Sequence, residues 1–308
     1  MIETWFLIAL LAPFLWAISN FVDKILLENL RPTHEPVGVL ILFSSLVSFF
    51  FIPCIYWYVG GDIAVSLSSK FLLIGAGCLE MFAIALYLLV LEKEETSSVI
   101  PLFQIIPFFS FLLGYFILGE VLTASQVFAG MGIIIGGILI SLDFKAEEGV
   151  RLKKRVLILA LVSSLAFSGF DVLFKSGAAG IDFATALFWQ HIGIAGVGVV
   201  LFLAFKKYRE ALLRCFSRRS LGFFGVNLAN EGLYFAGIAF FSYALLLAPI
   251  ALVASVTVYQ PVFVFLLAIP LSVFAPKLIQ EDLSHGHLLR KGIAIAIILL
   301  ASLWLVAA

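Results

Sequence analysis

The chain has 308 residues, of which 63% are hydrophobic and 12% are charged, and its mean hydropathy is +1.17. Soluble proteins carry roughly 25% charged residues, so this chain cannot cover a soluble fold of its size with a polar surface. Its formal net charge is zero, which gives no overall field that would attract nucleic acid. The composition therefore predicts a polytopic membrane protein with no nucleic-acid partner.

Ten apolar runs, each about 18 to 25 residues long, alternate with polar links, and this is the length that crosses a bilayer core. In lipid the backbone groups are satisfied only in helices or closed barrels, and these runs are too long and too uniformly apolar for barrel strands. We therefore predict an all-α fold with ten transmembrane helices. The spans are at about 4–23, 37–59, 70–91, 97–118, 124–142, 156–176, 183–205, 220–246, 250–274 and 287–307.

The ends of these runs carry few other signals. No basic residue precedes the first run and no small-x-small cleavage site follows it, so we expect a retained helix and no signal peptide. The break between the eighth and ninth spans, at Leu247-Ala248-Pro249, has no charge and depends on the proline. The three cysteines (Cys54, Cys78 and Cys215) form no CxxC pair and have no companion histidines. They predict neither a disulfide framework nor a metal site.

The basic residues predict an orientation. If the links alternate sides, one side carries only Lys70 and Lys175, and the other carries the remaining 17 of the 19 lysines and arginines. Loops rich in Lys and Arg stay in the cytoplasm. Both termini are therefore expected to be extracytoplasmic, in the plasma (inner) membrane.

An internal repeat divides the ten spans into two sets of five. VIPLFQIIPFFSFLLG (99–114) resembles VASVTVYQPVFVFLLA (253–268) at an offset of 154 residues, which aligns Pro107 with Pro261. SNFVDK (19–24) similarly resembles SGFDVLFK (168–175). Because five is odd, the second copy must insert upside down. We predict two inverted five-helix repeats, 1–145 and 155–308, with the substrate site between them near the membrane midplane.

Three stretches carry a resemblance to a known family: WAISNFVDK (16–24), ALYLLVLEKEETSSVIPLFQIIPFFSFLLGYFILGEVLTASQVFAGMGIIIGGILIS (85–141) and YALLLAPIALVASVTVYQPVFVFLLA (243–268). They resemble the EamA-type carriers of the drug/metabolite transporter superfamily. The resemblance implies ten helices around a central cavity and transport of small metabolites, often export. It also implies cytoplasmic termini, opposite to the charge bias. In the second half, Glu281 follows a two-turn insertion and takes the place of Glu120 in the LGE motif.

Polar side chains inside the spans are candidates for a substrate site, because such groups face the bundle interior and mark pathways. The candidates are Trp16, Asn20, Gln104, Trp189, His191, Asn227, Tyr234, Tyr259 and Gln260. Each also has a structural alternative, since amides and histidines hydrogen-bond between helices and tryptophans anchor at the interface.

Other groups inside the spans favour structural roles. Asp171 and Lys175 are one helical turn apart and can pair, and Asp23 and Lys24 also lie near a span end. Gly132 and Gly136 form a face of small residues suited to helix packing.

Two glutamates, Glu80 and Glu231, lie about ten residues from the start of their spans, too deep for a short side chain to reach the interface. An ionised carboxylate is costly there. A carboxyl group that exchanges between charged and neutral forms can carry a proton or pair with a cationic substrate. We therefore predict that both act as coupling groups.

The leading hypothesis is a secondary transporter that exports a small amphipathic metabolite, such as an amino acid or a related compound, with protons as candidate coupling ions. The alternative within transport is a flippase for a lipid or lipid-linked headgroup, for which Lys24 and Lys175 are the only basic candidates. An enzyme is disfavoured because no HExxH, P-loop, paired-aspartate or Ser-His pattern occurs. A channel is disfavoured because no pore-loop signature occurs. No cofactor is expected, and the protein is expected to be a monomer.

Overall fold

The computed structural model describes residues 3–30, 35–93, 102–141, 154–218, 221–274 and 285–307. Within these ranges the chain is almost entirely helical and contains no strand. The elements are α1 (Thr4–Leu30), α2 (Pro36–Tyr58), α3 (Leu67–Lys93), α5 (Ile106–Leu113), the π-helical turn η2 (Gly114–Leu118), α6 (Ala124–Ser141), α7 (Lys154–Gly177), α8 (Phe183–Ala204), α9 (Lys206–Arg218), α10 (Leu221–Leu247), α11 (Ile250–Val256), α12 (Tyr259–Phe274) and α13 (His285–Ala307).

Eight helices of the described chain are long and apolar enough to cross a membrane. Two shorter apolar helices, Ile106–Leu118 and Ala124–Leu139, fall where the fourth and fifth spans were predicted. The predicted all-α polytopic fold is therefore confirmed, whereas the count of ten spans and the inverted repeat remain predictions.

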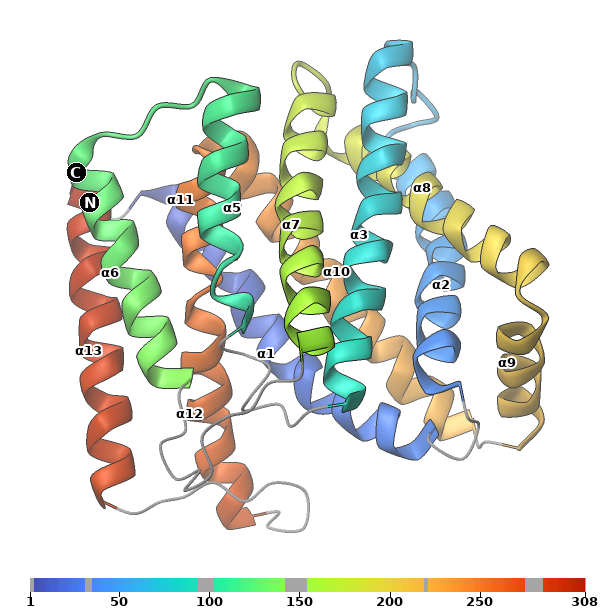
Figure 1. Cartoon of the computed structure of the whole chain (residues 1–308). Coiled ribbons are helices and arrows are strands. Elements are labelled where there is room, and N and C mark those ends of the chain that lie inside the picture. The colour runs from blue at the N-terminus through green and yellow to red at the C-terminus, as the bar shows by residue number, and fades with distance from the viewer. Residues whose placement is uncertain are drawn as a thin grey trace.

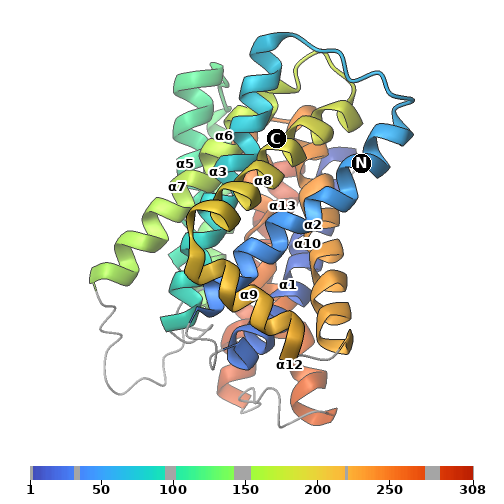
Figure 2. The ribbon, with the colours of Figure 1, turned by 90° about the vertical axis from the view of Figure 1, so that its right-hand side faces the viewer.

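Most of the described connections between helices lie at one end of the bundle, together with both termini (Figure 1). α3 begins and α7 ends at this end, with Lys70 in the first turn of α3 and Lys175 in the last turn of α7. The basic helix α9 lies toward the opposite end, beside α2 and α8 (Figures 1 and 2). The charge asymmetry seen in the sequence therefore corresponds to two ends of the folded molecule.

Helices from the two halves of the chain pack against each other throughout the bundle. α1 runs along α10 and α3 runs along α7, while α5 packs on α7 and α12 packs on α1. α2 pairs with α8, and α6 pairs with α13 at one edge of the bundle (Figure 1). Gly132 and Gly136 of α6 face Ala301 and Ile298 of α13, as expected for small residues between membrane helices.

Two helices are interrupted at matching places in the two halves. In the first half, a turn at 104–105 precedes α5, whose second residue is Pro107. In the second half, a turn at 257–258 separates α11 from α12, close to Pro261. Proline lacks the N–H group that would continue the helical hydrogen bonds, so both interruptions have the same cause. The ninth predicted span is therefore two helices.

α9 was predicted only as a charged link (206–219). Its described residues instead form an amphipathic helix, because Ala211, Leu212 and Cys215 share one face and are buried against the bundle. Lys207 forms a 3.2 Å ion pair with Glu35 at the start of α2, and the ring of Tyr208 covers Gly38. α9 is too short and too basic to cross the membrane.

The outer surface of the bundle is apolar, as lipid contact requires. Exposed hydrophobic side chains include Phe50 on α2, Val200 on α8 and Leu300 on α13. Trp57 and Tyr58, at the end of α2, are more than 80% exposed, at 82% and 83%. Aromatic residues at helix ends commonly mark the level of the lipid headgroups.

Helices α3 and α8 touch through glycines. A Cβ atom on Gly77 would overlap the backbone carbonyl of Gln190, and one on Gly193 would overlap the backbone of Ile74. Backbone atoms cannot rotate away as a side chain can, so both positions require glycine for steric reasons. This close contact joins the two halves.

We expect Gly193→Ala to push α3 and α8 apart and to lower the stability of the folded protein by about 1–3 kcal/mol, the usual cost of overpacking. Gly196→Ala on the same helix is the matched control, because a Cβ atom there meets nothing within 4 Å. Thermal unfolding of the purified variants in detergent measures the difference. Equal melting temperatures for the two variants would show that the α3–α8 contact is not limiting.

Candidate substrate cavity

A cavity of about 160 Å³ lies inside the bundle, bordered mainly by α1, α3, α7 and α10. One water needs about 10–15 Å³ of such a cavity, so about 11 to 16 waters would fill it, which is a volume that suits a small metabolite. Among the described residues, the lining consists of Trp16, Ser19, Asn20, Asp23, Leu40, Ser44, Met81, Ile84, Tyr87, Leu88, Leu91, Phe103, Gln104, Ile106, Phe167, Phe170, Asp171, Asn230, Glu231, Tyr234, Phe235, Ile238, Phe241, Thr257 and Gln260.

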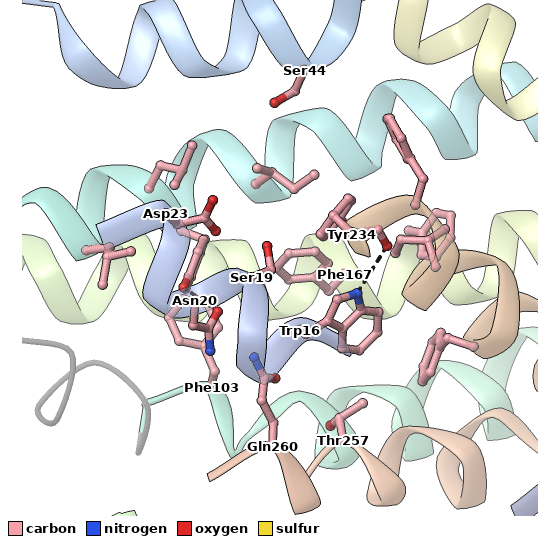
Figure 3. A pocket seen from close by; sticks show the side chains of 18 of the residues that line it. Trp16, Ser19, Asn20, Asp23, Ser44, Phe103, Phe167, Tyr234, Thr257 and Gln260 are labelled. Atoms are coloured by element: carbon pink, nitrogen blue, oxygen red, sulfur yellow. Dashed lines mark hydrogen bonds between the residues drawn. The ribbon is translucent and has the colours of Figure 1, made fainter. Parts of the chain in front are cut away.

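Aromatic rings form much of the wall. The indole of Trp16 lies 5.5 Å from the ring of Phe241 and 6.4 Å from that of Tyr234, and its Nε1 donates to the Tyr234 carbonyl at 3.4 Å (Figure 3). Tyr87 and Phe103 form an edge-to-face pair 5.4 Å apart. Stacked and edge-to-face rings provide a large apolar surface of fixed shape, so the cavity suits a ligand with an apolar body.

Three carboxyl groups also line the cavity, and each accepts a hydrogen bond from a neutral donor. Asn230 Nδ2 donates to Asp23 Oδ1 at 2.7 Å, and the Ser110 hydroxyl donates to Asp171 Oδ2 at 3.0 Å. The hydroxyl of Ser44 donates to Glu231 Oε1. In the described part of the chain, none of the lining residues is Lys, Arg or His.

Glu80 has a different environment from Glu231. Its side chain is fully buried behind the wall, and both of its oxygens are bound. Gln190 Nε2 donates to Oε2 at 2.6 Å, and the Tyr234 hydroxyl donates to Oε1 at 3.2 Å. Because Tyr234 also lines the cavity, Glu80 fixes one of its walls without lining it.

Every one of these carboxyl contacts joins the first half of the chain to the second. Glu80 and Asp23 belong to the first half and bind donors on α8 and α10. Asp171 and Glu231 belong to the second half and bind serines on α5 and α2. The cavity therefore lies where the two halves meet, and its polar groups hold them together.

Six of the residues singled out in the sequence line the cavity, and they come from four different helical regions. They are Trp16, Asn20, Gln104, Glu231, Tyr234 and Gln260. Trp16 and Asn20 approach from α1, and Gln260 approaches from the interruption near α12 (Figure 3). Whether they contact a substrate remains a prediction.

Four other candidates lie outside the described lining. Trp189 donates to the Ile63 carbonyl at 3.1 Å, with Lys70 Nζ 4.8 Å from its ring, at the end of the bundle that carries the termini. His191 bonds through Nδ1 to the Leu187 carbonyl at 2.9 Å on its own helix. These contacts to neighbouring backbone carbonyls favour structural roles for Trp189 and His191 over substrate binding.

The remaining two candidates are also buried away from the cavity. Asn227 lies in α10 one turn before Glu231, and it is 2% exposed. The ring of Tyr259 lies 6.1 Å from that of Phe6 and 6.3 Å from that of Phe263, between α1 and α12. The helical period correctly predicts that these residues face the interior of the bundle. The interior also includes packed regions between helices, and these two residues lie there and not in the cavity lining.

The expected pairing of Lys175 with Asp171 is replaced by a contact between the halves. Lys175 Nζ lies 2.7 Å from Glu120 Oε1 and donates to the Ala248 carbonyl at 2.6 Å. Glu120 Oε2 accepts from the backbone N–H of Ile250 at 2.8 Å. Gly119, at φ +68°, makes the turn that brings Glu120 to this position. The resulting cluster joins α7 to the turn after η2 and to the start of α11.

Sequence reasoning missed several lining residues. Asp23 was assigned to a span end because α1 continues to Leu30, beyond the apolar run that predicted it. Asp171 was assigned to a pair with Lys175, whereas its hydrogen bond comes from Ser110. The sequence does not distinguish Ser44 from its neighbour Ser45. In the structure the Ser44 hydroxyl donates to Glu231, whereas the Ser45 hydroxyl donates to the Ile41 carbonyl of its own helix. Helical period with Trp16 and Asn20 could have placed Asp23 on the same face.

The fold and the cavity define a class: a helical membrane protein with an aromatic, carboxyl-containing chamber between its halves. Residues 3–142 match the sequence model of the EamA-like transporter family. The resemblance of the chain to an EamA-type drug/metabolite transporter is thereby confirmed, and it indicates a membrane transporter. No curated protein sequence matches the chain.

Solved structures share the fold, and 17 of their chains match. One crystal structure of a protein superposes with a TM-score of 0.66, covering 100% of this chain and 97% of that chain at 16% sequence identity. At that identity the likeness concerns the fold alone.

We expect Gln190→Leu to leave Glu80 Oε2 without its donor and to lower the stability by about 1–3 kcal/mol, the cost of an unsatisfied buried polar group. Thermal unfolding in detergent measures the loss. Glu80→Leu provides the control through a double-mutant cycle, because the effect of Gln190→Leu should shrink when Glu80 is absent. An unchanged effect in that background would show that Gln190 acts through another neighbour.

Proposed function

We propose that this protein is a secondary transporter of the plasma membrane that exports a small amphipathic metabolite, such as an amino acid or a related compound. Transport occurs by alternating access between two inverted repeats, 1–145 and 155–308, coupled to protons and performed by the monomer. The match to the EamA-like family over residues 3–142 and the cavity between the halves support this proposal.

The observation that carries the proposal is the pair of helix interruptions that face the cavity. Gln104 lies at the interruption before α5, Thr257 lies at the one between α11 and α12, and Gln260 lies in the first turn of α12; all three line the cavity. Corresponding interruptions in the two halves of a transporter point to its substrate site. Broken helices also leave backbone groups that can bind a ligand.

The packing of the helices supports the inverted repeat. If 1–145 and 155–308 are equivalent, α1 corresponds to α7 and α3 to α10. The contact of α1 with α10 then corresponds to that of α7 with α3, and both are extensive. The α5–α7 contact corresponds in the same way to the packing of α11 and α12 on α1.

A flippase of the same fold was the alternative, and it would need basic side chains for an anionic headgroup. Neither Lys24 nor Lys175 is among the described lining residues, and Lys175 is bound to Glu120. The lining therefore favours a small metabolite over an anionic lipid headgroup.

The orientation follows from the basic residues, with both termini outside the cytoplasm. A C-terminal reporter that is active only in the cytoplasm should remain inactive, while the same reporter placed after Arg218 should be active. Activity at the C-terminus and none after Arg218 would mean that the chain inserts the opposite way.

Glu231 is proposed as the coupling group, because it lines the cavity and has a neutral partner, Ser44. Its second oxygen receives no hydrogen bond from the described residues, so it can bind and release a proton. In Glu231→Gln the amide oxygen still accepts from Ser44, so the protein should fold. The variant should lose transport driven by a pH gradient across proteoliposomes and retain substrate exchange without a gradient.

Glu80→Gln is the companion variant, at the corresponding position of the first half. Glu80 is buried behind Tyr234, so its substitution should cause a weaker defect of the same kind. Full gradient-driven transport by Glu231→Gln would reduce Glu231 to a hydrogen bond between helices.

A further inference from the structure

The lining contains several acids and no described base. Asp23, Asp171 and Glu231 line the same cavity, and Glu80 lies behind Tyr234 in its wall. Clustered carboxyl groups in a membrane interior repel one another unless protons or a cation balance them. A substrate with a positive charge would provide that balance.

The same lining offers no described basic side chain to an anion. The strongest recognition of a carboxylate or phosphate uses the charged side chains of Arg and Lys. The described basic side chains nearest to the acids are engaged or face elsewhere: Lys175 binds Glu120 and the Ala248 carbonyl, and Lys24 is not part of the lining. An amino-acid zwitterion would therefore bury its carboxylate beside other carboxyl groups.

Asp23 has the surroundings of an amine-binding residue. Its Oδ1 is held by Asn230 at 2.7 Å, while Oδ2 receives no hydrogen bond from the described residues. Asn20, one turn earlier on α1, lies beside it (Figure 3), and its Oδ1 accepts from the Tyr87 hydroxyl at 3.1 Å. The rings of Tyr87 and Phe103 are close by in the same wall, and aromatic faces attract cations.

An organic cation fits this cavity better than a metal ion does. Among the described residues, no group of three or more His, Cys, Asp or Glu side chains could hold a metal ion. The cavity is also larger than a bare ion needs, and most of its wall is apolar or aromatic. An ammonium group at Asp23 would leave the body of the molecule against Trp16, Tyr234 and Phe241.

We propose that the transported molecule is an organic amine with an apolar or aromatic body and no free carboxylate, and that Asp23 pairs with its ammonium group. This inference rests on the proposed transport function and selects, among amino acids and related compounds, those whose carboxylate is absent or masked. Glu231 is left to couple transport to protons.

Four small molecules, each with one aromatic ring, test separately whether the cavity binds an ammonium group or a carboxylate. Phenylalanine methyl ester has the amine alone, 3-phenylpropionate the carboxylate alone, phenylalanine both, and 3-phenyl-1-propanol neither. The measurement is the shift in melting temperature of the purified full chain, since a ligand that binds the folded state raises it. The ester should raise the melting temperature, and the other three should not at the same concentration.

Asp23→Asn tests the residue. The new amide can still accept from Asn230 through its oxygen, and an unchanged melting temperature without ligand checks that the variant is folded. Its affinity for the ester should fall by about 10- to 100-fold, the range expected for losing a charge-assisted hydrogen bond. Asp62→Asn is the matched control, because Asp62 lies in an exposed connection away from the cavity and its variant should bind like the unmodified chain.

Each other result overturns part of the proposal. Equal binding of phenylalanine or of the alcohol, or no binding of the ester, would overturn the substrate class and leave the transport function standing. Full affinity in Asp23→Asn would remove Asp23 as the partner. If the ester binds through Asp23 but proteoliposomes do not transport it, the amine site stands and the transport function fails for this class.

Discussion

Four carboxyl groups of the described chain lie inside an otherwise mostly apolar bundle, and the rest of the structure depends on how they are satisfied. A carboxyl group cannot remain without partners inside a membrane. The partners of Glu80 and Glu231 come from opposite halves of the chain, as do those of Asp23 and Asp171. The cavity and the hydrogen bonds of its carboxyl groups therefore both require contact between the two halves. The glycine contact between α3 and α8 brings the backbones close enough for the Gln190 side chain to reach Glu80.

The sequence predicts the class of fold because apolar length is an unambiguous signal in lipid. The positions of polar residues in the spans also predict which helix faces point inward. Trp16, Asn20 and Gln260 were predicted in this way, and all three line the cavity. It cannot separate Glu80 from Glu231, because both stand alone in apolar runs of similar length. Their difference comes from Gln190 and Ser44, which lie 110 and 187 residues away in the chain.

The α9 helix and the cluster at Glu120 were also not predicted from the sequence. The α9 helix lies in a stretch dominated by basic residues, although the buried Leu212 and Cys215 follow a helical spacing that a closer reading could detect. The cluster at Glu120 depends on a left-handed turn at Gly119 and on the carbonyl of Ala248, a backbone group that no side-chain pattern reports. Contacts to the backbone require the fold before they can be seen.

The strength of the hydrogen bonds between the halves affects how quickly the two halves can come apart. Asp23, Asp171 and Glu231 accept hydrogen bonds from asparagine and serine, and no described arginine or lysine forms a salt bridge with them. Hydrogen bonds between membrane helices contribute on average about 0.6 kcal/mol each, so a few of them can break and form again through ordinary thermal motion. A rigid network of ion pairs at the centre would lock the halves together. A centre held by neutral donors would permit the separation of the halves that the proposed transport cycle requires.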